Sequence, residues 1–70
     1  MQTIDFNKSI PEGVIFSIKD VNNMGAIKAD MLRKLIFNRE ITVVKIGSKN
    51  FIARETLLKY LQDNVIPATN

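Results

Sequence analysis

Basic side chains are concentrated in the middle of this chain, and they are the residues best suited to a binding role. Residues 28–54 contain two acidic residues, Asp30 and Glu40, and seven basic ones: Lys28, Arg33, Lys34, Arg39, Lys45, Lys49 and Arg54. The net charge of this segment is therefore +5, whereas the rest of the chain carries −2. Such an asymmetry indicates a polyanionic partner. A solvated basic surface without any partner is the alternative explanation.

The residue types that most catalytic and metal sites need are scarce. The chain has no cysteine and no histidine, which excludes disulfides, thiolate metal sites and imidazole bases. The seven carboxylates show no paired spacing within one element, and no glycine-rich phosphate loop occurs. We therefore expect a protein that is not an enzyme and that binds no cofactor, metal or small-molecule ligand.

The length of 70 residues predicts one domain with a small core. A chain this short buries only about 60% of the surface that its unfolded form exposes. Apolar runs do not exceed three residues, which is too short for a membrane span. The beginning, MQTIDFNKS, lacks the basic-then-apolar order of a signal peptide. We therefore expect a cytoplasmic location without membrane contact.

Two short helices are expected in the first half of the chain, after a short strand at residues 14–16. Ser17 and Asp20 have the spacing of a capping box, so the first helix should begin at Ile18. It should run to about Met24 and end at Gly25, which can adopt a positive φ.

The second helix should cover roughly residues 28–38. Its buried stripe follows helical spacing and comprises Met31, Leu32, Leu35 and Ile36. The opposite face carries Ala29, Asp30, Arg33, Lys34 and Phe37. We expect Phe37 to pack against the N-terminal segment, at Phe6, Ile10 or Phe16, and Asn38 to close the helix in the left-handed conformation.

A hairpin and a third helix are expected in the second half. The β-branched residues 42–46 predict one strand, Phe51 and Ile52 its return, and residues 47–50 the turn. Because side chains alternate along a strand, Lys45 should point to the outer face of the hairpin, opposite Val44 and Ile46. The third helix should run from residue 54 to about residue 64 and bury Leu57, Leu58 and Leu61, with Tyr60 at the edge.

This order of elements predicts an α+β, mainly helical fold: a winged helix-turn-helix domain with a two-stranded wing, a C-terminal helix and a short extra N-terminal strand. Residues 1–15 should be a partly ordered segment, residues 16–64 the domain, and residues 65–70 a flexible tail. In such domains the second helix lies in the major groove. Arg33 would then reach base edges, whereas Lys28 and Lys34 would hold phosphates. The wing would reach phosphates or the minor groove beside it.

Residues 16–62 also resemble a known family, the small excisionase-type winged helix-turn-helix domains, which are related to the DNA-binding half of mercury-resistance-type regulators. The matching residues are Leu35-Ile36, Val44-Lys45-Ile46-Gly47, Ile52, Arg54, Leu57, Tyr60 and Leu61. The resemblance implies an excisionase, a recombination directionality factor that binds and bends DNA beside an attachment site and assists an integrase. It also implies the cytoplasm of a bacterial or phage-infected cell, in association with the nucleoid.

The resemblance places the DNA contacts on two elements. On the second helix they are Ala29, Asp30, Arg33 and Lys34, beside the phosphate contact expected of Lys28, and on the wing they are Lys45, Ser48, Lys49 and Asn50. Arg39 and Arg54 are candidates for phosphate contacts, although Arg54 can instead brace the fold or pair with Glu55 and Glu40. The chain departs from the family pattern at Arg39, where glycine is common, and at Thr42, where proline is common. The turn at residues 25–30 is also longer and lacks the usual Ser cap, which Asp30 can replace.

The implied partners are double-stranded DNA, an integrase contacted through the C-terminal region, and further copies of the chain bound cooperatively on DNA. Two alternatives remain open. One is a small transcriptional regulator of a phage, plasmid or integrated element. The other is a protein-interaction module on the same scaffold, which would use Phe37 and residues 65–70.

Overall fold

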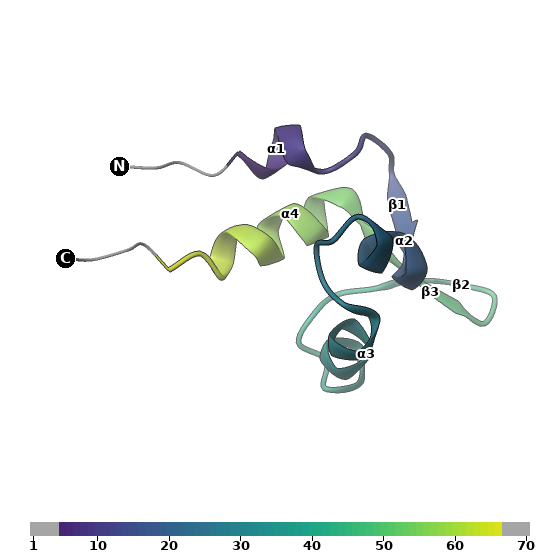
Figure 1. Ribbon diagram of the computed structural model, residues 1–70. Helices are drawn as coiled ribbons and strands as arrows, with labels where there is room; N and C mark the ends of the chain where they lie inside the picture. The colour runs from purple at the N-terminus through teal and green to yellow at the C-terminus, as the bar shows by residue number, and fades with distance from the viewer. Residues whose placement is uncertain (1–4, 67–70) are drawn as a thin grey trace.

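The computed structural model describes residues 5–66, and these form a small α+β fold of four helices and a three-stranded antiparallel sheet (Figure 1). The elements are, in chain order, α1 (Phe6–Ser9), β1 (Ile15–Ser17), α2 (Ile18–Asn23), α3 (Ala29–Phe37), β2 (Val44–Ile46), β3 (Lys49–Ala53) and α4 (Arg54–Asp63). The expected α+β class is confirmed, and α1 is an element that the sequence analysis did not predict. Residues 1–4 of the predicted N-terminal segment and residues 67–70 of the predicted tail lie outside the described range.

The sheet has the strand order β1-β3-β2, so β3 is its central strand. β1 pairs with β3 so that Phe16 lies opposite Ile52, and β2 pairs with β3 so that Lys45 lies opposite Asn50. The hairpin turn is shorter than the four residues expected. Because Ile46 pairs with Lys49, only Gly47 and Ser48 lie between the strands. Gly47 has φ +64°, as the first central residue of a type II′ turn requires.

The core draws one fully buried side chain from each of four elements. These side chains are Val21 of α2, Leu32 of α3, Ile52 of β3 and Leu57 of α4. Leu58, Tyr60 and Leu61 are partly buried and pack against this cluster, in agreement with the expectation for the last helix. The expectation for Met31 is wrong, because its side chain is 51% exposed. It lies at the edge of the buried face, between buried Leu35 and exposed Lys34 around the helix.

The N-terminus of α2 has the predicted capping box. The Asp20 N–H donates to Ser17 Oγ at 3.0 Å, and the Ser17 N–H donates to Asp20 Oδ2 at 3.1 Å. At the other end Gly25 has φ +81°, which confirms its expected role in ending the helix. Both ends of α2 are therefore set by local sequence signals.

The C-terminus of α3 differs from the expectation. Asn38 has φ −83°, and the left-handed residue is Arg39, with φ +59°. Two backbone bonds close the helix there: the Arg39 N–H donates to Ile36 O at 3.1 Å and the Glu40 N–H donates to Leu35 O at 2.8 Å. This is a Schellman arrangement, which normally places glycine at the left-handed position. A side chain there costs roughly 1–2 kcal/mol.

We expect Arg39→Gly to raise the free energy of unfolding by about 0.5–1 kcal/mol, because glycine removes this strain but loses more chain entropy on folding. Urea denaturation measures the change. Asn38→Gly is the matched control, since Asn38 already has a negative φ and should gain nothing from glycine. Equal effects of the two substitutions would contradict the strain at Arg39.

Candidate nucleic-acid interface

The exposed face of α3 carries a strip of four side chains opposite buried Leu32 and Leu35. The strip, hereafter the α3 strip, follows i, i+3, i+4, i+7 spacing and comprises Asp30, Arg33, Lys34 and Phe37. Phe37 is 86% exposed, so the expectation that it packs against the N-terminal segment is wrong. The reason is geometric: the N-terminal segment packs along α4 (Figure 1), whereas Phe37 lies on the exposed face of α3.

Arg33 and Asp30 form an ion pair on this strip. The distance between Arg33 Nη1 and Asp30 Oδ1 is 3.5 Å, and both side chains are well exposed. Ion pairs at such positions contribute little to stability because water screens them. The Arg33 guanidinium can therefore exchange Asp30 for another acceptor, such as a base edge or a phosphate.

The N-terminus of α3 is capped by a residue of α2. Asn22 Oδ1 accepts a hydrogen bond of 2.9 Å from the Ala29 N–H, whereas the N-cap residue Lys28 makes no side-chain capping bond. Asp30 therefore does not replace the missing Ser cap of α3, in contrast to the expectation. The bond ties the last turn of α2 to the first turn of α3, which fixes the relative position of the two helices. It also leaves Ala29 half-buried at the edge of the α3 strip.

The hairpin carries basic side chains on both of its faces. The strand register places Lys45 and Asn50 on the same face as buried Phe16 and Ile52, which is the face that α2 packs against. Lys45 therefore does not lie on the outer face, and that expectation is wrong. Because register shifts of one residue exchange the two faces, this assignment depends on the observed pairing of β2 with β3.

The outer face of the hairpin instead carries Val44, which is 37% exposed, and Ile46, which is 54% exposed, with Lys49 beside them. Lys49 and Asn50 belong to β3 and not to the turn, in contrast to the expected four-residue turn. Ser48 occupies the turn and is exposed, whereas Asn50 is half-buried.

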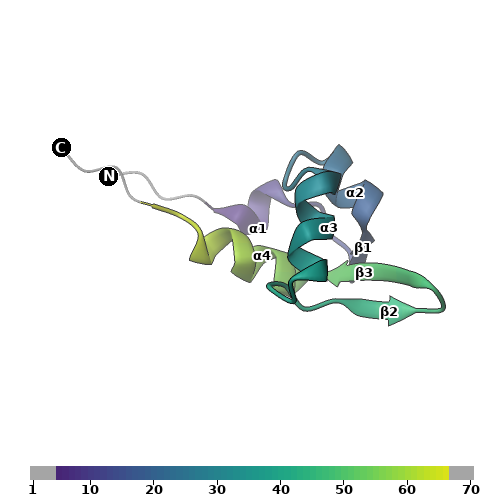
Figure 2. The same cartoon turned by 90° about the horizontal axis from the view of Figure 1, so that it is seen from below.

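The α3 strip and the hairpin lie in the same half of the molecule. Figure 1 shows α3 at the edge opposite α1, and the view from below in Figure 2 shows α3 nearest the viewer with the hairpin extending from its side. The exposed basic residues in this half are Lys28, Arg33, Lys34, Arg39, Lys45 and Lys49. They provide the cationic groups of the candidate interface.

Arg54 has a different role from the other basic residues of the central segment. Its guanidinium donates four hydrogen bonds: Nε to Pro11 O at 2.9 Å, Nη1 to Asn7 Oδ1 at 3.0 Å, and Nη2 to Asn7 O at 2.8 Å and to Ile10 O at 3.0 Å. These bonds hold α1 and the segment that follows it against the start of α4. The arrangement favours bracing of the fold over a phosphate contact, because the donors already have partners. Arg54 does not form the alternative ion pair with Glu55 or Glu40.

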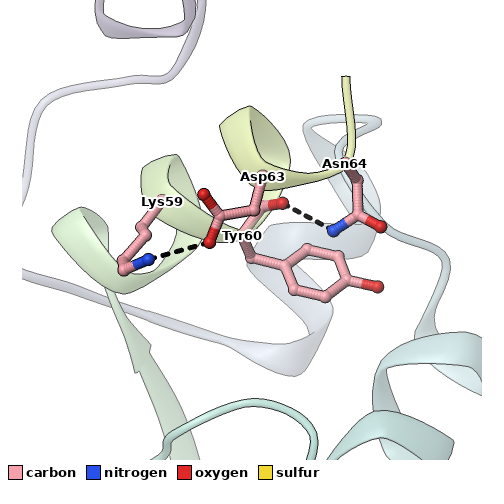
Figure 3. Close-up of polar contacts among 4 residues, drawn as sticks. All are labelled: Lys59, Tyr60, Asp63 and Asn64. Carbon is pink, nitrogen blue, oxygen red and sulfur yellow. Dashed lines mark hydrogen bonds and ion pairs between the residues drawn. The ribbon is translucent and has the colours of Figure 1, made fainter. Parts of the chain in front are cut away.

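The C-terminal end of α4 carries polar contacts of its own (Figure 3). The Lys59 ammonium donates to Asp63 Oδ2 at 2.8 Å; this hydrogen bond and the carboxylate charge raise the pKa of Lys59 above its ordinary value. Asn64 Nδ2 donates to Tyr60 O at 2.7 Å and so caps the helix end. The charge of Lys59 is therefore balanced locally, away from α3 and the hairpin.

Within residues 5–66, no group of three histidine, cysteine, aspartate or glutamate side chains is placed to hold a metal ion. No helix in this range has the length and hydrophobicity to cross a membrane. No family model, curated protein or solved structure matches the chain.

We expect Asn22→Ala to lower the free energy of unfolding by about 1 kcal/mol, because the Ala29 N–H loses its cap. Amide hydrogen exchange should quicken most in the first turn of α3. Asn23→Ala serves as the control, since it is exposed on the same helix and has no side-chain hydrogen bond to any described residue. Equal losses for both variants would show that Asn22 has no special role.

We expect Arg54→Ala to lower the free energy of unfolding by about 2–3 kcal/mol, since charge-assisted hydrogen bonds are worth more than neutral ones. Arg54→Lys should recover little of this, because an ammonium cannot reproduce the planar set of donors. Urea denaturation and amide exchange of residues 6–13 measure the effect. Lys59→Ala should change little, and a wild-type exchange pattern in Arg54→Ala would rule out the bracing role.

Proposed function

We propose that this protein is a sequence-specific double-stranded DNA-binding protein of the winged helix-turn-helix type. The observation that carries the proposal is the α3 strip, whose Arg33 and Lys34 project from a helix that Asn22 fixes to α2. The basic hairpin in the same half of the molecule supports it further. α2 and α3 form the helix pair, and the β2–β3 hairpin is the wing.

In this mode α3 enters the major groove, which is about 12 Å wide and admits one helix. Arg33 leaves Asp30 and donates two hydrogen bonds to O6 and N7 of a guanine, which is the commonest specific contact. Lys28 and Lys34 lie on either side of it along the chain and neutralise phosphates. Their contribution depends on salt, because each phosphate contact releases counterions.

The wing adds contacts beside the major groove. Lys45 and Lys49 lie on opposite faces of β2 and β3, so the hairpin presents a cation whichever face approaches the backbone. Arg39 follows α3 directly, is exposed, and is held in place by the closing bonds of the helix. These residues position the protein on the duplex, whereas Arg33 reads its sequence.

Within this class we propose the role of an excisionase, which binds and bends DNA beside an attachment site and assists an integrase. This step rests on the resemblance of residues 16–62 to excisionase-type domains. Several adjacent sites with strong bending in a permuted-fragment gel assay would support it. A single site over a promoter would support the alternative, a small transcriptional regulator of a mobile element.

The second alternative, a protein-interaction module, has a separate observation in its favour. Val44 and Ile46 expose apolar surface on the outer face of the hairpin, and Val14 is 82% exposed. Exposed apolar side chains of this kind occur at protein interfaces. Absence of duplex binding at low salt would favour this role over DNA binding.

The DNA-binding proposal predicts different effects for two basic residues. Arg33→Ala should cost about 1–3 kcal/mol of binding free energy and relax the sequence preference at one position. Lys49→Ala should weaken binding to all duplexes alike and reduce the slope of log K against log salt by about one. Fluorescence anisotropy with labelled duplexes at several salt concentrations measures both effects.

Lys8→Ala is the matched control, because Lys8 is exposed on α1, on the side of the molecule away from α3 (Figure 1). It should leave affinity, sequence preference and salt slope close to those of the wild type. If Lys8→Ala and Lys49→Ala weakened binding equally, the charge of the whole protein would explain binding and the proposed surface would be wrong.

A further inference from the structure

Phe37 is the largest apolar side chain on the proposed DNA-binding face. It belongs to the last turn of α3 and is 86% exposed. Leu32 and Leu35, on the opposite side of the same helix, are buried. Phe37 therefore adds little to the core, and its ring is accessible to a partner.

The surroundings of Phe37 are cationic. Arg33 and Lys34 precede it by one helical turn on the same face, and exposed Arg39 follows it by two residues. The core of a protein–protein interface is depleted in lysine, although arginine and aromatic side chains are enriched there. A DNA major groove, in contrast, offers phosphates to the cations and one apolar group, the C5 methyl of thymine, to the ring.

We infer that Phe37 contacts a thymine methyl in the major groove and makes the protein prefer thymine at that position. The inference rests on the proposed DNA-binding function and adds a specificity residue to it. Phe37 lies four residues after Arg33, which is about 6 Å along the helix axis. Base pairs are stacked about 3.4 Å apart, so the thymine lies within about two base pairs of the guanine read by Arg33.

The experiment begins with selection of duplexes from a randomised pool by the wild-type protein. Each thymine of the selected duplex is then replaced singly by deoxyuridine, which removes only the methyl group. At one position this should lower the wild-type affinity about fourfold, as expected for one buried methyl. Phe37→Ala should lower the affinity for the thymine duplex at least as much and abolish the difference between the two bases.

Two variants serve as controls. Phe37→Leu retains an apolar side chain and should keep part of the preference for thymine over deoxyuridine. Met31→Ala removes another exposed apolar side chain of α3 that lies outside the α3 strip, and it should keep the full preference. Because Phe37 is exposed, thermal unfolding of Phe37→Ala should match that of the wild type.

The outcomes separate this inference from the proposed function. Wild-type binding to duplex with equal affinity for thymine and deoxyuridine at every position would overturn the role of Phe37 and leave DNA binding intact. A failure of the wild type to bind any duplex at low salt would overturn both. If the wild type self-associates in sedimentation without DNA and Phe37→Ala does not, Phe37 makes a protein contact and the inference is wrong.

Discussion

The cross-strand pair of Phe16 and Ile52 joins the two halves of this chain, and the position of every proposed DNA contact depends on it. Both side chains are buried, and the pair lies where β1 meets the central strand β3. β1 leads directly into α2, whose N-cap is Ser17. β3 pairs with β2 to form the hairpin and leads into α4. A two-stranded hairpin alone is marginally stable in water, so the third strand holds the hairpin rigid relative to the helices.

Two side chains complete this arrangement by bonding to backbone groups of other elements. Asn22 holds the first turn of α3, and Arg54 holds α1 and the segment that follows it. Backbone groups left without partners are costly wherever they are shielded from water, so such links replace contacts that a larger core would provide. The hydrogen bonds of Arg54 also change the interpretation of the basic central segment. Arg54 is engaged in the fold, and the other six basic residues of the central segment are exposed.

The features that the sequence predicted correctly are those set by neighbouring residues. The capping box of Ser17 and Asp20, the helix end at Gly25 and the hairpin at Gly47 each depend on a few adjacent positions. Two features that the sequence analysis missed depend on contacts between distant residues. The cap from Asn22 spans seven positions and the bonds of Arg54 span more than forty, so no local spacing indicates them. Phe37 was misplaced for a related reason: hydrophobicity predicts burial, but only the path of the N-terminal segment decides whether a partner is present.

Asp30 explains how a basic surface of this kind can favour base contacts over general attraction to phosphates. Its carboxylate is the single acidic group of α3, lies in the first turn, and pairs with Arg33 at 3.5 Å. A carboxylate there suits the positive end of the helix dipole, but it repels phosphate from the position where backbone binding would otherwise be strongest. In the proposed mode Arg33 must leave Asp30 to bind DNA, and a bidentate guanine contact compensates for that loss better than a single screened phosphate does. The freed carboxylate can then accept a hydrogen bond from a cytosine amino group. In the proposed mode Asp30 would therefore lower non-specific affinity more than specific affinity, which is a condition for sequence preference.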